Sequence, residues 1–327
     1  QKAAERTGMP KNIYQHVHDT GFEIARGLVE HPVTKAVGFT GSFQGGKALY
    51  DLANQRPHPI PVFAEMGSVN PVLLFPKALQ KNAKKWGESY AGSITLGCGQ
   101  FCTNPGLLIA IASPELDEFI DVLQNGIANS PSQQMLHDGI STAYHNGKAN
   151  IVSEGIVDIL SNNSNANQRL GDPCLAKVNG SKFMANPGLQ SELFGPYSLI
   201  VECTDSTEML AVIETLEGQL TGTMIVEESE MSEFSMHFET LKAKVGRVVF
   251  NGVPTGVEVC AAMTHGGPFP ASTDSRFTAV GPDAIKRFAR PVSYQDCPLS
   301  LLPQALKNEN PNAIYRKING VISNESV

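Results

Sequence analysis

The chain has 327 residues, with 25 Lys or Arg against 32 Asp or Glu, so its net charge is −7 when histidines are neutral. At about 150 residues per domain, this length predicts two domains, each large enough for a hydrophobic core. An apolar fraction of 41% with 17% charged residues excludes a disordered chain. The acidic balance argues against nucleic acid as a partner, and no apolar run approaches the ~20 residues of a bilayer span.

The number and spacing of the cysteines indicate whether the protein resides in a reducing or an oxidising compartment. Six cysteines without a CxxC pair predict neither a disulfide framework nor a zinc ribbon. Their low density fits a reducing compartment, so we expect a cytoplasmic protein. The chain begins with Gln1 instead of Met, and we expect an earlier segment to be missing.

The N-terminal part of the chain alternates between β-rich runs and stretches whose apolar residues have helical spacing. Strands are predicted at residues 12–18, 35–40 and 61–64, with helices at 22–30 and 46–55 between them. Alternation of this kind is typical of a parallel sheet with crossover helices.

The same alternation continues more loosely to Asn251, after which Gly, Pro, Ser and Thr dominate up to Pro282. Continuous apolar runs here are typical of strands covered on both faces. The predicted strands are residues 72–75, 107–112, 219–226 and 246–251, and the predicted helices are residues 79–91, 114–128, 207–216, 230–244 and 283–289. The elements together predict an α/β fold.

Four segments carry residues suited to chemistry, and the first is FTGS at residues 39–42 with Gly45 and Gly46 behind it. Small residues between a strand and a helix let the backbone approach a phosphate, and the helix start offers N–H groups to it. The alternative is a plain strand–helix turn with Ser42 as N-cap.

The second segment is EMGSVNP at residues 65–71. Glu65 ends an apolar strand, where a carboxylate is poorly placed for solubility alone and well placed for a general base. The alternative is an exposed loop glutamate.

The third segment is the glycine-rich loop of residues 97–106, which contains Cys98 and Cys102. Backbone N–H donors around such a loop can stabilise a thiolate, whereas most single cysteines are buried and inert. Two cysteines without His or Asp neighbours do not predict a metal site. The fourth segment is ELFGP at residues 192–196, which alone reads as a loop that enters a strand. His265 lies in a Gly/Pro-rich stretch where histidines commonly face solvent.

These segments, in this order, resemble those of the aldehyde dehydrogenase superfamily. The cofactor-binding FTGS of the family, with a following Gly, resembles residues 39–42 and Gly46. Its general-base block ELGG-x-x-P is similar to residues 65–71, with Met66 and Ser68 in place of the commoner residues.

The other two family blocks are also matched. The nucleophile block GQ-x-C is similar to Gly99, Gln100 and Cys102, and the E-x-FGP block to Glu192 and residues 194–196. Four blocks in the family's order are very unlikely to arise by chance.

A narrower resemblance points to one branch of the family. Residues 59–71, 101–106 and 264–268 look like the 2-oxoglutarate semialdehyde (2,5-dioxovalerate) dehydrogenases and a bacterial NADP-linked fatty aldehyde dehydrogenase. The end of the chain, residues 310–320, is similar to the end of those proteins. The resemblance implies oxidation of an aldehyde to an acid with NADP or NAD, with 2-oxoglutarate semialdehyde as the expected substrate.

The resemblance also implies roles for individual residues. Cys102 would be the nucleophile, Glu65 the general base, and His265 a residue that tunes the thiolate or assists the base. No metal is expected. The cofactor-binding residues implied are Thr40, Gly41, Ser42, Gly46, Glu192 and Phe194.

Family members are longer and begin with most of a Rossmann-like cofactor domain. The resemblance therefore implies that residues 1–66 are the last portion of an NAD(P)-binding domain. Residues 67–282 would form the parallel-sheet catalytic domain, and residues 283–327 a C-terminal return segment with a role in oligomerisation. We expect a homodimer or homotetramer that acts on a small-molecule aldehyde without nucleic-acid or membrane partners. A fatty or general aldehyde dehydrogenase and a catalytically silent scaffold are the alternatives.

Overall fold

The computed structural model describes residues 2–327, and the chain divides into two compact units. The first unit ends at Arg287 and the second is Phe288–Val327. No helix in the described part of the chain combines the length and apolar character that a bilayer crossing requires.

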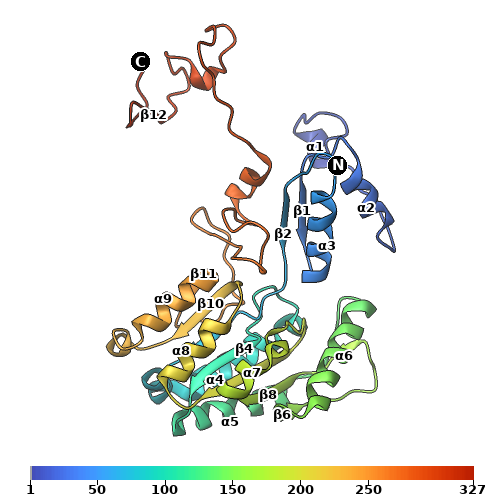
Figure 1. Ribbon diagram of the computed structural model, residues 1–327, viewed down its shortest axis with the longest axis vertical. Helices are drawn as coiled ribbons and strands as arrows, with labels where there is room; N and C mark the ends of the chain where they lie inside the picture. The colour runs from blue at the N-terminus through green and yellow to red at the C-terminus, as the bar shows by residue number, and fades with distance from the viewer. Residues whose placement is uncertain (1) are drawn as a thin grey trace. The chain divides into compact units, whose positions relative to one another are not determined.

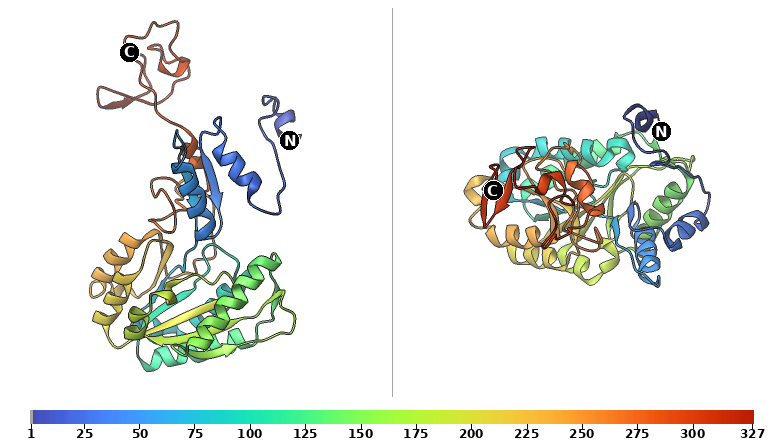
Figure 2. Two further views of the ribbon diagram at one scale, coloured as in Figure 1. Left: turned by 45° about the vertical axis from the view of Figure 1, so that its right-hand side comes forward. Right: turned by 90° about the horizontal axis from the view of Figure 1, so that it is seen from above.

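A small parallel sheet forms near the N-terminus of the first unit. Its strands are β1 (Val37–Thr40) and β2 (Val62–Glu65), connected through α3 (Phe43–Asn54), which runs alongside them (Figures 1 and 2). The strand–helix–strand alternation predicted for this region is confirmed. The register places Thr40 opposite Glu65, so both residues end their strands at the same edge.

The structure corrects one prediction at the start of the chain. Residues 12–18 form no strand, and their side chains are exposed on both sides of the backbone. No neighbouring strand supplies hydrogen bonds there, and an alternating pattern alone does not make a strand. The adjacent helices are α1 (Lys2–Arg6) and α2 (Glu23–Glu30), the second of which was predicted.

A seven-stranded sheet forms the centre of the first unit, with the strand order β11-β10-β3-β4-β9-β8-β6. All neighbouring strands are parallel except β6 and β8, which are antiparallel. The strands predicted from the sequence are β3 (Val72–Leu74), β4 (Leu107–Ile111), β9 (Tyr197–Cys203), β10 (Gln219–Ile225) and β11 (Val245–Phe250). The strands that were missed are β6 (Asp158–Asn162) and β8 (Cys174–Asn179).

Helices cover both faces of this sheet (Figure 1). Alternate residues of each strand face opposite layers: Val72 and Leu108 pack in one hydrophobic cluster, and Leu73 and Ile109 in another. The first cluster includes residues of α4 (Pro76–Thr95) and α5 (Pro114–Ala128). The second includes residues of α6 (Asp138–Glu154), α7 (Gly180–Ala185), α8 (Ser206–Thr215) and α9 (Ser235–Lys244).

Two helices differ from the sequence prediction for identifiable reasons. Helix α6 was missed because it buries only Ser141, Tyr144 and Lys148, so its sequence has no apolar stripe. Helix α9 starts five residues later than predicted, because a separate 3₁₀ turn, η3 (Glu228–Glu230), precedes it with its own capping box. The short helix predicted near residue 283 is also a 3₁₀ helix, η4 (Pro282–Phe288).

Short elements complete the chain. A two-residue pair joins β5 (Gln133–Gln134) to β7 (Leu170–Gly171), and the second unit contains the 3₁₀ helix η5 (Gln304–Leu306). That unit ends in an antiparallel hairpin of β12 (Arg316–Ile318) and β13 (Val321–Ser323). Its Asn-Gly turn has positive φ at both residues, as a two-residue hairpin turn requires.

Candidate active site

A tight reversal of the backbone positions Cys102. After α4, the 3₁₀ helix η1 (Leu96–Gly99) has left-handed φ angles of 55°, 61° and 62° at Gly97, Cys98 and Gly99. A Cβ atom at Gly99 would collide with the carbonyl group of Gly195, so the loop lies directly against the segment that begins at Glu192. This packing leaves Cys102 half-buried beyond the reversal.

The two cysteines of this loop differ in environment. Cys98 is buried, and its sulfur hydrogen-bonds the carbonyl oxygen of Gln133. Burial raises the pKa of the Cys98 thiol, which keeps it protonated at neutral pH. Cys98 is therefore the inert cysteine of the pair.

Glu65 is not an exposed loop residue, since only 5% of it is accessible. It ends β2 and forms an isolated antiparallel bridge with Ser272. The next residue, Met66, donates its backbone N–H to the carbonyl oxygen of Ala271. The stretch of residues 263–274 thus closes over the end of β2 and buries the carboxylate.

His265 reaches both of these groups with one nitrogen atom. Its Nε2 lies 3.4 Å from Cys102 Sγ and 3.2 Å from Glu65 Oε1. The residue is 4% exposed, and its backbone N–H donates to Thr278 Oγ1. The structure therefore places His265 inside the protein and not on a solvent-facing loop.

The surroundings of His265 favour its charged form. Hydrogen bonds to Cys102 and then to Glu65 raise the pKa of His265 to about 9, although burial acts in the opposite direction. At neutral pH an imidazolium then lies between a sulfur atom and a carboxylate.

The same three side chains are of the types that bind zinc, and their ligand atoms lie within 4.8 Å of one another. However, Nε2 is already shared between sulfur and carboxylate, and the buried Nδ1 has no acceptor within residues 2–327. A metal-binding histidine almost always donates its second N–H to an acceptor. The arrangement thus favours proton transfer over metal binding.

Asn70 connects the Glu65 segment to the cysteine loop, a role that the sequence analysis missed. Its Nδ2 donates to the carbonyl oxygens of Cys102 and Asn104, each at 2.9 Å. The residue is completely buried and has a φ of 46°. Asparagine tolerates left-handed backbone better than most residues, which is the signal that could have pointed to it.

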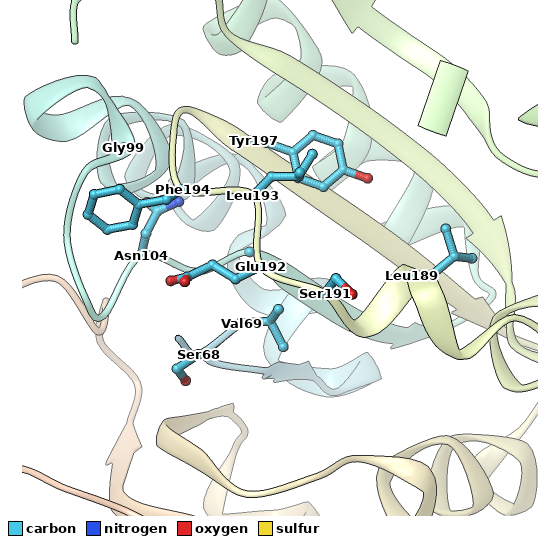
Figure 3. Close-up of a pocket in the computed structure, with 11 residues that line it drawn as sticks. Ser68, Val69, Gly99, Asn104, Leu189, Ser191, Glu192, Leu193, Phe194 and Tyr197 are labelled. Atoms are coloured by element: carbon cyan, nitrogen blue, oxygen red, sulfur yellow. The ribbon is translucent and has the colours of Figure 1, made fainter. Parts of the chain in front are cut away.

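Glu192 joins the same region. A Cβ atom at Gly67 would lie 2.5 Å from Glu192 Oε2, so the carboxylate packs directly against the Gly67 backbone, where no side chain intervenes. Burial raises the pKa of Glu192 to about 7, against a hydrogen bond from the Ser68 backbone that lowers it. Figure 3 shows Glu192 reaching into the space between Asn104 and Ser68. Phe194 lines the same pocket.

The FTGS segment ends β1 and begins α3. Ser42 caps this helix, with Oγ accepting from the Gly45 N–H at 3.2 Å, as the structural alternative predicted. Thr40, Gly41 and Ser42 are exposed at the carboxyl edge of a parallel strand, where ligands of open α/β sheets bind. Gly46 lies against the Met66 side chain, so α3 packs on the Glu65 segment.

Comparisons with known proteins identify the family of the chain. Residues 1–289 match the model of the Aldehyde dehydrogenase family. Alpha-ketoglutaric semialdehyde dehydrogenase 2 of Azospirillum brasilense is 46% identical over 319 residues, which cover 97% of this chain and 61% of that protein. Alpha-ketoglutaric semialdehyde dehydrogenase of Acinetobacter baylyi is 44% identical over 325 residues, which cover 99% and 61%. The chain thus spans 61% of the length of these two relatives.

The fold also has solved counterparts. The crystal structure of 1-pyrroline-5-carboxylate dehydrogenase from Thermus with bound NAD has a TM-score of 0.72 and 19% identity to this chain. The match covers 88% of this chain and 55% of that one, and it shows a shared fold. Since the family model covers all of the first compact unit, the chain belongs to the aldehyde dehydrogenase family.

Proposed function

We propose that the intact protein oxidises an aldehyde to a carboxylic acid with NAD+ or NADP+, and that its substrate is 2-oxoglutarate semialdehyde. The observation that carries the proposal is the contact of His265 Nε2 with both Cys102 Sγ and Glu65 Oε1. The names of the two relatives, at 46% and 44% identity, support the choice of substrate.

Cys102 is the proposed nucleophile. Its sulfur lies 3.4 Å from His265 Nε2 and, as the thiolate, attacks the aldehyde carbon and forms a thiohemiacetal. The oxyanion that forms needs N–H donors, and the Cys102 backbone N–H is one candidate. NAD(P)+, when bound, supplies a hydride acceptor for the carbon attached to sulfur. Cys102 then holds the acyl group as a thioester.

Glu65 is the proposed general base for hydrolysis of the thioester. Its carboxylate accepts a proton from water, and the hydroxide releases the acid from Cys102. His265 Nε2 also contacts this carboxylate, so the same imidazolium lies next to both the nucleophile and the base. We therefore assign His265 to supporting these two residues through its charge.

The residues present fit a dinucleotide cofactor. Ser42 and the first N–H groups of α3 would hold the pyrophosphate, as helix N-termini commonly do. Glu192 would accept hydrogen bonds from a ribose, and Phe194 would position the nicotinamide. Asn104 lines the same pocket as Glu192, and its buried Oδ1 has no hydrogen-bond partner in the part of the chain that the structure describes, so a polar group of a ligand could satisfy it.

Two alternatives share this site. A fatty or general aldehyde dehydrogenase would use the same three side chains on a different substrate. A catalytically silent scaffold would have no need to keep a buried thiol–imidazole–carboxylate contact, which costs free energy to bury and is therefore evidence against it.

The proposal has a direct test. The intact protein is mixed with 2-oxoglutarate semialdehyde and NAD(P)+, and both the reduced cofactor and the intact mass of the protein are measured. Cys102→Ala should abolish turnover and the acyl adduct, whereas Cys260→Ala, at an exposed free cysteine, should retain both. Turnover that persists in Cys102→Ala would contradict the mechanism.

We also propose the domain division, the compartment and the assembly expected from the sequence, with boundaries after residues 66 and 282. All six cysteines are free, which fits the cytoplasm.

In the second unit, the exposed Val321 and Ile322 lie on a strand paired on one side only, which favours contact with another copy. Removal of residues 288–327 should lower the oligomeric state measured by light scattering.

A further inference from the structure

Arg247 lies beside the histidine loop. It is the third residue of β11, directly after Gly246, and Gly246 lies against the carbonyl oxygen of Gly266. Because Gly266 follows His265 in sequence, the start of β11 packs against the backbone that carries the imidazole. This packing brings Arg247 to the edge of the proposed active site.

The charge of Arg247 has no acidic partner in residues 2–327. Its only hydrogen bond there runs from Nη2 to the carbonyl oxygen of Pro254, at 2.7 Å. The ion pairs of the described residues do not include it, and its buried Nε has no acceptor. A partly desolvated guanidinium without an anion costs free energy, which an anionic ligand would offset.

The pKa of Arg247 is affected both by burial and by the nearby Cys102. Burial lowers the pKa of the guanidinium, and the charge of Cys102 acts in the opposite direction. Arg247 is therefore both partly withdrawn from water and within electrostatic range of the reactive sulfur.

A second unpaired polar group lies next to Arg247. Thr221 of β10 is its register partner, and side chains paired in a parallel sheet point to the same face. Thr221 is completely buried, and its Oγ1 has no hydrogen-bond partner among the described residues. A hydroxyl and a guanidinium side by side are suited to a carboxylate or an α-oxo acid.

The position of the guanidinium is fixed by the loop that follows β11. Ser93 of α4 hydrogen-bonds Thr255 at 2.9 Å, and Tyr90 donates to the carbonyl oxygen of Gly252 at 3.0 Å. These bonds hold the backbone around Pro254, which in turn accepts from Arg247. A preorganised group of this kind binds a ligand with little loss of conformational entropy.

We propose that Arg247 and Thr221 form the subsite for the carboxylate end of the substrate, at the opposite end from the aldehyde that meets Cys102. The inference rests on the proposed function and narrows its substrate class to aldehydes that carry a second, anionic end. A guanidinium can bind a carboxylate through two parallel N–H donors. A fatty aldehyde has no group to satisfy Arg247, so this subsite separates the two candidate substrate classes.

The first experiment compares two aldehydes of equal length on the intact protein: glutarate semialdehyde, which has a terminal carboxylate, and pentanal, which has none. Arg247→Met should raise the KM for glutarate semialdehyde by about 10- to 100-fold, as expected for loss of a charge-assisted hydrogen bond. Its kcat/KM for pentanal should change by less than about 3-fold. The KM of Arg247→Lys for glutarate semialdehyde should lie between those of the wild type and Arg247→Met. Arg169→Met, at an exposed arginine paired with Asp138, should have the same KM as the wild type.

Two results would overturn the subsite. Equal losses on both aldehydes would mean that Arg247 acts on the Cys102 thiolate, and no loss on either would mean that it binds no part of the substrate. Thermal unfolding of each variant checks that the fold is kept. If Arg247→Met does not fold, Arg247→Lys decides between the same outcomes, since lysine keeps the charge without the two parallel donors.

A second experiment does not require turnover, so it separates failure of the subsite from failure of the proposed function. Glutarate should slow alkylation of Cys102 by iodoacetamide in the wild type and in Arg169→Met, but not in Arg247→Met. If no aldehyde is oxidised yet this protection is seen, the proposed function fails and the anion subsite stands. If glutarate gives no protection in the wild type, the subsite is refuted.

Discussion

His265 Nε2 lies 3.2 Å from Glu65 Oε1, although 200 residues of chain separate the two. The contact exists because residues 263–274 return to the end of β2, where Ser272 pairs with Glu65. The same nitrogen contacts Cys102 Sγ, so a single proton on Nε2 is shared by the sulfur and the carboxylate. The three residues should therefore respond as a unit when any one is changed.

The reactivity of Cys102 should depend on His265. In His265→Gln the cation next to the sulfur is lost, so the thiolate is less favoured and alkylation by iodoacetamide at neutral pH should slow by about 10-fold. The difference in alkylation rate between wild type and variant should shrink as the pH rises through about 9, where the raised pKa of His265 makes the imidazole lose its proton. The change is measured by mass spectrometry of the Cys102 peptide, with the peptide of Cys260 as internal reference. An alkylation rate that is unchanged at every pH would remove the imidazolium from the proposed mechanism.

The same residue should make stability depend on pH in a defined direction. The pKa of His265 is about 9 in the folded protein against an ordinary value of 6.5, so the folded state binds the proton more tightly. The stabilisation is fully present below pH 6.5 and is lost as the pH rises from 6.5 through about 9. The difference in free energy of unfolding between wild type and His265→Gln should shrink over this window by about 3 kcal/mol at most. Urea titrations at several pH values measure it, and a difference that grows with pH would contradict the assignment.

Local sequence predicted much of the fold, because many strands and helices can be recognised from the hydrophobic pattern and capping residues of their own segment. The strands β3 and β4 are continuous apolar runs, and α5 has an N-cap serine followed by proline. Strand β8 was missed because Lys177 interrupts it, and that lysine is accommodated only by an ion pair with Glu202 of the adjacent strand. Such a partner cannot be seen within the segment.

Residues of the candidate site that depend on partners distant in sequence were likewise not predicted. Cys102, Glu65 and His265 were each suggested by a short motif or by the family resemblance. The role of Asn70, whose side-chain amide donates to the carbonyl oxygens of Cys102 and Asn104 (the Asn70 clamp), was not suggested. It depends on carbonyl groups more than 30 residues away in the chain. Arg247 was also missed, because what distinguishes it is the absence of an acidic partner among residues 2–327, which only the packed structure reveals.

Asn70 should contribute strongly to both stability and activity. Asn70→Ala removes the donor for the carbonyl oxygens of Cys102 and Asn104 and places alanine at a φ of 46°. Loss of two buried hydrogen bonds together with backbone strain predicts a decrease in unfolding free energy of about 2–4 kcal/mol. Asn70→Gly keeps the backbone relaxed and should lose less stability while losing similar activity. Equal stability of Asn70→Ala and the wild type in urea titrations would show that the clamp is unimportant.

Gly67 should be required for cofactor binding and not for folding alone. In Gly67→Ala the new Cβ would lie 2.5 Å from Glu192 Oε2, so the Glu192 side chain must move away from the pocket that it lines with Phe194. If Glu192 binds the cofactor, the KM for NAD(P)+ should rise by about 10-fold, the cost of one displaced hydrogen bond to a charged group, while the KM for the aldehyde changes little. Gly92→Ala is the matched control, because nothing lies within 4 Å of the added methyl group on α4. A cofactor KM that is the same in both variants would exclude Glu192 from the cofactor site, because its carboxylate cannot keep its position beside an alanine at residue 67.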